Sequence, residues 1–251
     1  MNIVACMKRV PTTDLQPKIG ADGKTLEATG IQYMVSFYDE IAVEEAVKTR
    51  EAHGGEVTVI TLGPSAASKE LRECLAKGAD KGVILVDDEW QSRDAHATAR
   101  ALQGKIEELG SELVFCGRVA TDRDNAAVGP MLATLLGWAC VTDAIELEIG
   151  ADGACTAKRE ADGGVESYSF SLPAVITCQK ALNEPRYAGL KGIMAAKKKP
   201  IEEVPAPAAG NQAEVVALEL PPERKEGRIV GEGAEAVPAL LEALRNEAKI
   251  L

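Results

Sequence analysis

The sequence predicts an α/β protein with a mostly parallel sheet, an antiparallel extension and a C-terminal arm. Three observations lead to this prediction. Short apolar runs, typical of strands buried on both faces, alternate with helical segments as far as Gly137. Segments of alternating polarity, separated by Ala-Asp-Gly turns, follow between residues 144 and 171. A stretch rich in proline and alanine, Pro205–Gly210, then reads as a linker to the C-terminal residues.

Four strand–helix units are expected before Gly137. Their strands are the apolar runs Ile3–Met7, Val57–Leu62, Val83–Val86 and Leu113–Cys116. Their helices are expected over Asp39–His53, Ala66–Lys77, Asp94–Leu109 and, capped by Asp122 or Asp124, up to Leu136. Strands and helices that alternate at this spacing predict a parallel, Rossmann-like sheet with right-handed crossovers.

The connection between the first strand and the first helix is long. Within it, Asp22-Gly23 is a hairpin turn signal between Pro17–Ile19 and Thr25–Ala28. Because connections of this length usually carry function or structure of their own, we expect an inserted hairpin. A disordered loop is the alternative.

The pattern changes to a period of two after Gly137. An antiparallel meander is expected over Ala144–Ile149, Ala154–Glu160 and Glu166–Ser171, followed by a buried strand within Leu172–Cys178 and a loop at Asn183–Met194. We therefore expect a nucleotide-binding domain over residues 1–200 and an arm over 201–251. The arm carries a strand-like run, Glu214–Leu220, and an amphipathic helix, Glu235–Ala248, which could dock on another protein or on its own domain.

Composition limits the function further. The chain has 251 residues and a net charge of -11, which disfavours nucleic acid and anionic membranes as main partners. No apolar run is long enough to span a bilayer, and the N-terminal charges follow the first apolar run, which is the reverse of a signal peptide. The expected location is the cytoplasm or the mitochondrial matrix.

No side-chain catalyst is evident. The six cysteines are scattered without a Cys-x-x-Cys pair, and we expect them to be reduced and mostly buried. Neither a Ser-His-Asp set nor metal-ligand spacing nor a phosphate-loop motif occurs. Gly231–Ala236 fits Gly-x-Gly-x-x-Ala, but the strand before it is too short for a βαβ unit.

Ligands of such sheets lie beyond the carboxyl ends of the strands, which here are Met7–Pro11, Leu62–Ser65 and Gly117–Asp124. Small residues after the last turn would let a ligand approach the backbone, and a helix N-terminus suits a phosphate. An ordinary βα turn is the alternative. Two acidic residues there oppose an anion unless they cap the helix or bind ribose hydroxyls.

Several motifs resemble those of electron-transfer flavoprotein β subunits. The most specific are Ala157–Glu166 with Leu172–Thr177, which looks like the family signature apart from Tyr168, and Asn183–Ala188 with the lysines at 197–199. Lys8–Val10, Glu40–Ala46 and Gly78–Asp80 agree as well. The resemblance extends from Ile3 to the C-terminus.

This resemblance implies a fold like that of adenine-nucleotide α-hydrolases and a heterodimer with an α subunit that holds FAD. Electrons would pass between flavin dehydrogenases, such as acyl-CoA dehydrogenases, and a membrane quinone oxidoreductase. The β subunit would bury AMP or, in electron-bifurcating members, a second FAD that accepts electrons from NADH. Together with the crevice positions, the candidate nucleotide site is Cys6, Ser36, Leu62, Gly63, Asp122, Arg123, Asp124, Asn125, Ala126, Ala127, Val128 and Gly129.

Departures from the family pattern leave the identity of the nucleotide, AMP or FAD, undecided. Ser36-Phe37 replaces the usual Asn-Pro, and Ala126-Ala127 removes an amide side chain, whereas Val128-Gly129-Pro130 looks like bifurcating members. A nucleotide-binding stress or sensor protein with the same sheet topology is an alternative of another class.

The segment Tyr187–Ala195 resembles the family's recognition loop, which docks flavin dehydrogenases. Its expected contact residues are Tyr187, Leu190, Ile193 and Met194, with Leu190 as the anchor. Gly189, Lys191 and Gly192 depart from the family pattern, which leaves the choice of partner open.

Overall fold

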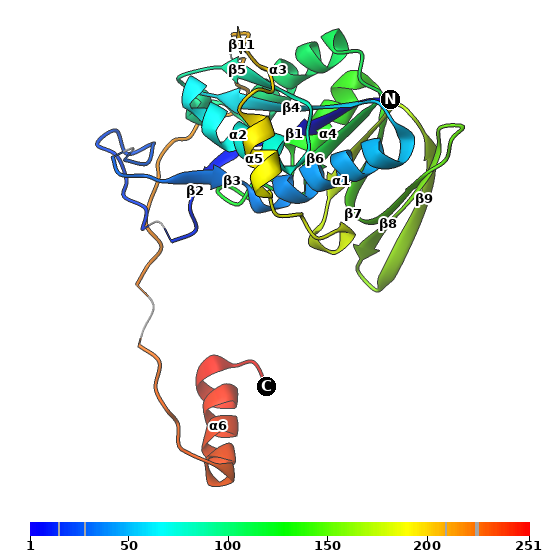
Figure 1. Ribbon diagram of the computed structural model, residues 1–251. Helices are drawn as coiled ribbons and strands as arrows, with labels where there is room; N and C mark the ends of the chain where they lie inside the picture. Colours follow the sequence, from blue (N-terminus) through cyan, green and yellow to red (C-terminus); the bar gives the residue numbers. More distant parts are fainter. Residues whose placement is uncertain (15, 28, 209, 224–225) are drawn as a thin grey trace. The chain divides into compact units, whose positions relative to one another are not determined.

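The computed structural model describes residues 1–251 except 15, 28, 209, 224 and 225, and forms two compact units, Met1–Leu218 and Glu219–Leu251 (Figure 1). The described part of the first unit contains a nine-stranded sheet of order β11-β5-β4-β1-β6-β10-β7-β8-β9 and a two-stranded sheet, β2-β3. The predicted α/β class and mostly parallel sheet are therefore confirmed.

β1 (Asn2–Cys6) lies at the centre of the large sheet, between β4 (Glu56–Gly63) and β6 (Leu113–Gly117). Four further strands run parallel to these three. They are β5 (Lys81–Val86), β11 (Ile201–Pro205), β10 (Ala174–Cys178) and β7 (Ala139–Ile149). β8 (Ala154–Ala161) and β9 (Gly164–Ser171) then extend the sheet antiparallel. The predicted meander is confirmed, although β7 begins before Ala144.

Helices cover both faces of the sheet. α1 (Phe37–His53) and α2 (Ser68–Lys77) pack on one face, and α5 (Leu190–Ala196) lies against α2, as Figure 1 shows. α3 (Ala95–Glu108) and α4 (Val128–Leu136) pack on the other face and contact each other. The first unit thus forms three layers, and each face of its sheet has its own apolar core.

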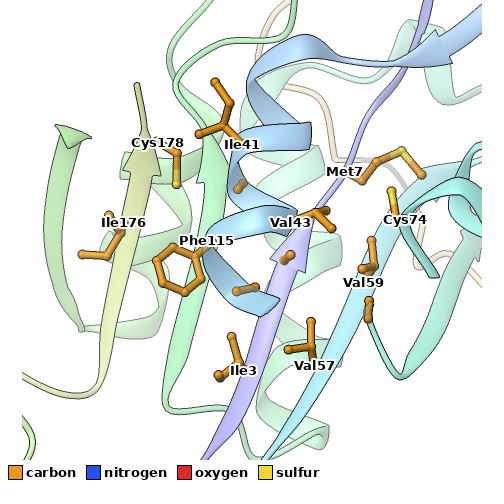
Figure 2. Packing of buried hydrophobic residues seen from close by; sticks show 14 of the residues in the cluster. Ile3, Met7, Ile41, Val43, Val57, Val59, Cys74, Phe115, Ile176 and Cys178 are labelled. Carbon is orange, nitrogen blue, oxygen red and sulfur yellow. The ribbon is translucent and has the colours of Figure 1, made fainter. Parts of the chain in front are cut away.

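Alternation along the strands divides the core residues between these two layers. Ile3 of β1, Phe115 of β6 and Ile176 of β10 lie under α1, where Ile41 and Val43 meet them (Figure 2). The residues next to them on the same strands, Val4, Val114 and Val175, belong to the core under α3 and α4. A strand buried on both faces explains why the sequence shows continuous apolar runs there.

The inserted hairpin is confirmed in part. Ile19 and Leu26 form an antiparallel bridge, and the Asp22 carboxylate accepts hydrogen bonds from the backbone N–H groups of Lys24 and Thr25. Ala28, the expected end of the second hairpin strand, lies outside the described residues. The sequence did not predict β2 (Arg9–Pro11) or β3 (Tyr33–Val35), which pair antiparallel at the base of the insertion.

Two expectations for the later chain are wrong. The arm does not begin at residue 201, because β11 pairs with β5 as an edge strand. The run 214–220 forms no strand among the described residues; instead it is exposed, irregular chain. The linker 205–210 includes Ala209, which lies outside the described residues.

The second unit contains the predicted C-terminal helix. α6 (Val237–Ala243) follows a short 3-10 turn, Ala234–Ala236, and continues into a π-helical turn, Leu244–Ala248. Within the described residues, no helix combines the length and apolar character that crossing a membrane requires.

Candidate functional site

The sheet topology creates a crevice at the carboxyl ends of β1 and β6. The chain leaves β1 toward α1 on one face, whereas it leaves β6 toward α4 on the opposite face. Neighbouring strands whose connections diverge in this way leave a crevice beyond their carboxyl ends, where ligands of α/β sheets bind. This is the region in which the sequence places the candidate nucleotide residues.

The structure brings several of these residues together. The Ser36 hydroxyl, before α1, accepts a hydrogen bond of 3.3 Å from the backbone N–H of Thr121 in the turn after β6. Cys6 and Leu62, at the ends of β1 and β4, share an apolar cluster with Val128 of α4. Gly63 follows Leu62 at the end of β4, next to β1. Asn125 and Ala126 are exposed on the turn.

The turn between β6 and α4 is longer than the sequence predicts. Asp124 and Ala126 both adopt positive φ angles, of 52° and 50°, which L-residues with a side chain rarely adopt. These two residues redirect the chain, so α4 begins only at Val128 and Ala127 is its N-cap residue. The prediction that Asp122 or Asp124 caps this helix is therefore wrong.

This N-terminus of α4 is open to an anion. No side chain caps it, and its first turn carries no acidic residue. The first N–H groups of a helix have no partner within the helix and carry partial positive charge. The small residues Ala126 and Ala127 leave these groups accessible to a ligand.

Lys8 neutralises Asp122, one of the two acidic residues that the sequence sets against an anion here, whereas Asp124 is exposed on the same turn. The Lys8 ammonium donates to both carboxylate oxygens of Asp122, at 2.8 and 2.6 Å. Burial lowers the pKa of Lys8, and the neighbouring Asp122 opposes that shift. The sequence could not reveal this pair, because its two members lie far apart along the chain.

Asp39 links the two strand ends that border the candidate site. The sequence did not identify it as a site residue. Its buried carboxylate accepts the backbone N–H of Lys8 at 2.8 Å and that of Gly117 at 3.0 Å, so it links the ends of β1 and β6. A Cβ on Gly117 would lie 2.3 Å from the same carboxylate, which explains why glycine ends β6. Burial raises the pKa of Asp39 to about 7.

Arg123 fixes the turn to the loop that follows β5. Its guanidinium donates to the backbone carbonyls of Gln91 and Arg93. Arg93 is itself buried, where it pairs with Asp87 and donates to the carbonyl of Pro207. The turn after β6 is thus tied to a loop on the β5 side of the crevice.

Gly129, which the sequence places in the candidate nucleotide site, packs closely against β10. A Cβ at this position would lie 2.5 Å from Cγ2 of Thr177, so glycine lets α4 lie close to β10. A side chain at Gly129 would therefore disturb the fold, and a clean test of anion binding must use another residue of the turn.

A second candidate site lies around α5. Tyr187, Leu190, Ile193 and Met194 expose 98, 77, 45 and 56% of their surface. The sequence predicts a loop here, but residues from Leu190 onward form α5, so that expectation is wrong in part. Exposed apolar groups gathered on one short segment suit contact with another protein.

These features define a Rossmann-like α/β protein whose strand connections diverge at a switch point between β1 and β6. Residues 24–209 match the electron transfer flavoprotein domain family. The chain is similar to proteins named electron transfer flavoprotein subunit beta, with 36% identity to that of Bacillus subtilis and 37% to that of Bradyrhizobium diazoefficiens, each over the full length of both proteins. The mitochondrial protein of Oryza sativa subsp. indica is 38% identical, also over both full lengths. The chain therefore belongs to the electron transfer flavoprotein β-subunit family, as its motifs indicate.

Proposed function

We propose that this β subunit joins an α subunit that holds FAD, and that the complex carries electrons between flavin dehydrogenases and a membrane quinone oxidoreductase. An adenine nucleotide, AMP, occupies the β crevice and has a structural role. The observation that carries the nucleotide assignment is the uncapped N-terminus of α4, next to an Asp122 that Lys8 already neutralises. The proposed location is the bacterial or archaeal cytoplasm or the mitochondrial matrix.

A second candidate function is electron bifurcation, in which the crevice holds a second FAD that accepts electrons from NADH. The observation in its favour is Val128-Gly129-Pro130 at the start of α4. The flavin content of the purified αβ complex decides between the two functions. One FAD per complex supports the carrier, and two support the bifurcating complex.

Replacement of Ala127 by aspartate tests the nucleotide site. The new side chain can cap α4 and stabilise it by about 1 kcal/mol. Its charge should nevertheless lower AMP affinity by about tenfold, because it repels the phosphate and competes for the same N–H groups. Thermal unfolding and calorimetric titration of the nucleotide-depleted αβ complex with AMP measure the two effects.

Ala127→Ser is the matched control for this variant, because serine caps the helix without adding charge. It should retain more AMP affinity than Ala127→Asp. Equal affinity of both variants and the unmodified complex would place the phosphate away from α4.

Replacement of Leu190 by alanine tests the surface around α5. Leu190 is 77% exposed, so its loss should leave the fold, α-subunit binding and flavin content unchanged. If it fills a pocket on the dehydrogenase, the interaction should weaken by about 1–2 kcal/mol. Steady-state electron transfer over a range of αβ concentrations measures the apparent affinity.

Val216→Ala is the control for this prediction, because Val216 is an exposed aliphatic residue outside α5. It should leave the transfer kinetics unchanged. An unaltered apparent affinity in Leu190→Ala would contradict the docking role of this surface.

A further inference from the structure

The exposed residues around α5 belong to a segment that is fixed at both ends to the helices beneath it. We call residues 187–196 the docking segment. It carries Tyr187 and the outward side chains of α5, and Figure 1 shows α5 lying against α2 beside α1. The docking role itself rests on the function proposed above.

The first attachment is Arg186, immediately before the docking segment. Its guanidinium donates to the Glu44 carboxylate from Nε and Nη2, each at 2.9 Å, and to Glu51 from Nη1 and Nη2 at 2.7 and 3.0 Å. The backbone N–H of Arg186 also donates to Glu44, at 3.0 Å. Glu44 and Glu51 lie two helical turns apart on α1, so both carboxylates reach one guanidinium.

The arrangement differs from a surface ion pair because the Glu44 carboxylate is buried. The Glu44 side chain is 5% exposed and that of Arg186 is 35% exposed. The two carboxylates raise the pKa of Arg186 further above its ordinary value. A forked guanidinium that meets two carboxylates fixes direction as well as position, which an ammonium cannot do.

The second attachment joins the other end of the docking segment to α2. The Arg72 guanidinium donates to the carbonyls of Ala196 and Lys199, both at 2.6 Å. Lys199 in turn donates to the carbonyl of Ala79 at 2.6 Å, near the end of α2. A Cβ on Gly192 would lie 2.3 Å from the carbonyl oxygen of Ala76, so glycine lets α5 lie directly on α2.

We propose that Arg186 is a positioning residue for partner docking: held by Glu44 and Glu51, it fixes the docking segment in the conformation that the dehydrogenase binds. It need not contact the dehydrogenase itself. A segment ordered in advance loses less conformational entropy on binding, so the contribution of Arg186 appears in affinity and not in the rate of electron transfer. The contacts with α2 hold the segment from α5 onward, so its N-terminal end at Tyr187 depends on Arg186.

Arg186→Lys tests this proposal in the intact αβ complex. Lysine keeps the charge but loses the fork, so amide hydrogen exchange in residues 187–196 should accelerate by about tenfold. The KM for αβ in dehydrogenase turnover should rise about fivefold, with kcat, α-subunit yield and FAD content unchanged. Glu51→Gln removes one partner of the fork and should change both quantities in the same direction by less.

Arg100→Lys is the matched control, because Arg100 is an exposed arginine on α3, which packs on the face of the sheet opposite α1 and α2. It should leave exchange in residues 187–196 and KM unchanged. If Leu190→Ala raises KM while Arg186→Lys changes neither exchange nor KM, the positioning role is overturned and the docking role stands. If Arg186→Lys accelerates exchange but neither variant raises KM, the docking role fails and the positioning proposal fails with it.

Discussion

Asp39→Ala is expected to lower the free energy of unfolding by roughly 2–5 kcal/mol, since it removes the acceptor of two half-buried backbone N–H groups, those of Lys8 and Gly117. Each loses its acceptor at the point where β1 and β6 end. The edges of the proposed nucleotide crevice would separate as well. Urea unfolding of the β subunit measures the stability, and AMP titration of the αβ complex measures the effect on the crevice.

Asp39→Asn separates loss of the acceptor from loss of charge. Asparagine keeps one carbonyl acceptor but turns an N–H toward the other donor, so its stability should lie between those of the unmodified subunit and Asp39→Ala. An Asp39→Ala subunit as stable as the unmodified one would show that the carboxylate does not hold the strand ends together.

The same carboxyl group should make stability depend on pH. Burial raises its pKa in the folded subunit to about 7, from an ordinary value of 3.8. Between these two values the folded state keeps the proton and the unfolded state has lost it, so stability falls as pH rises through this window. Below about pH 4 and above about pH 7 the group adds no further slope.

Comparison with Asp39→Asn isolates this effect, because asparagine does not titrate. Unfolding free energies at about pH 5 and about pH 8 should differ more for the unmodified subunit than for the variant. Equal differences would assign the pH dependence to other groups.

Sequence pattern predicted the parts of the fold in which burial dominates. The strands around β1 are covered on both faces, so their apolar runs are continuous and distinctive. β11 was missed because it lies at a sheet edge, where Glu202 and Glu203 face solvent and only Ile201 and Val204 suggest a strand. β2 and β3 have three residues each and depend on contacts such as that of the Arg9 guanidinium, 4.0 Å from the centre of the Tyr33 ring.

Tertiary contacts also explain what the sequence could not predict at the two sites. Gly192 argues against a helix on propensity, yet it is the residue that allows α5 to approach α2. The topology of the crevice followed from strand order, but the Asp39 bridge and the Lys8–Asp122 pair depend on residues distant in sequence. Likewise, the sequence makes Asp122 look like the cap of α4. The positive φ angles of Asp124 and Ala126 show that the helix begins later.

The remaining large effect concerns the C-terminal unit. Deletion of residues 221–251 should abolish stable assembly with the α subunit and leave the sheet domain folded. The compact unit that contains the entire sheet ends at Leu218, so the deletion removes none of its strands. The Asp94 carboxylate, which accepts the backbone N–H groups of Gln212 and Ala213, would also retain its partners.

The deletion removes an exposed apolar surface, which we expect the α subunit to cover. Val237, Leu240 and Leu241 of α6 are 50, 44 and 40% exposed, and Ile229 before it is 86% exposed. We expect these side chains to become buried on the α subunit, and their loss to weaken assembly by at least tenfold, since buried aliphatic groups contribute about 1.5–3 kcal/mol each. Co-expression with tagged α subunit measures recovery of the complex, and thermal unfolding of the truncated β subunit checks its fold.

The double substitution Leu240→Ser and Leu241→Ser in the full-length chain is the matched variant, because it keeps the arm but removes its apolar face. Both variants should reduce recovery of the complex. Normal recovery of both complexes would show that the arm does not hold the α subunit.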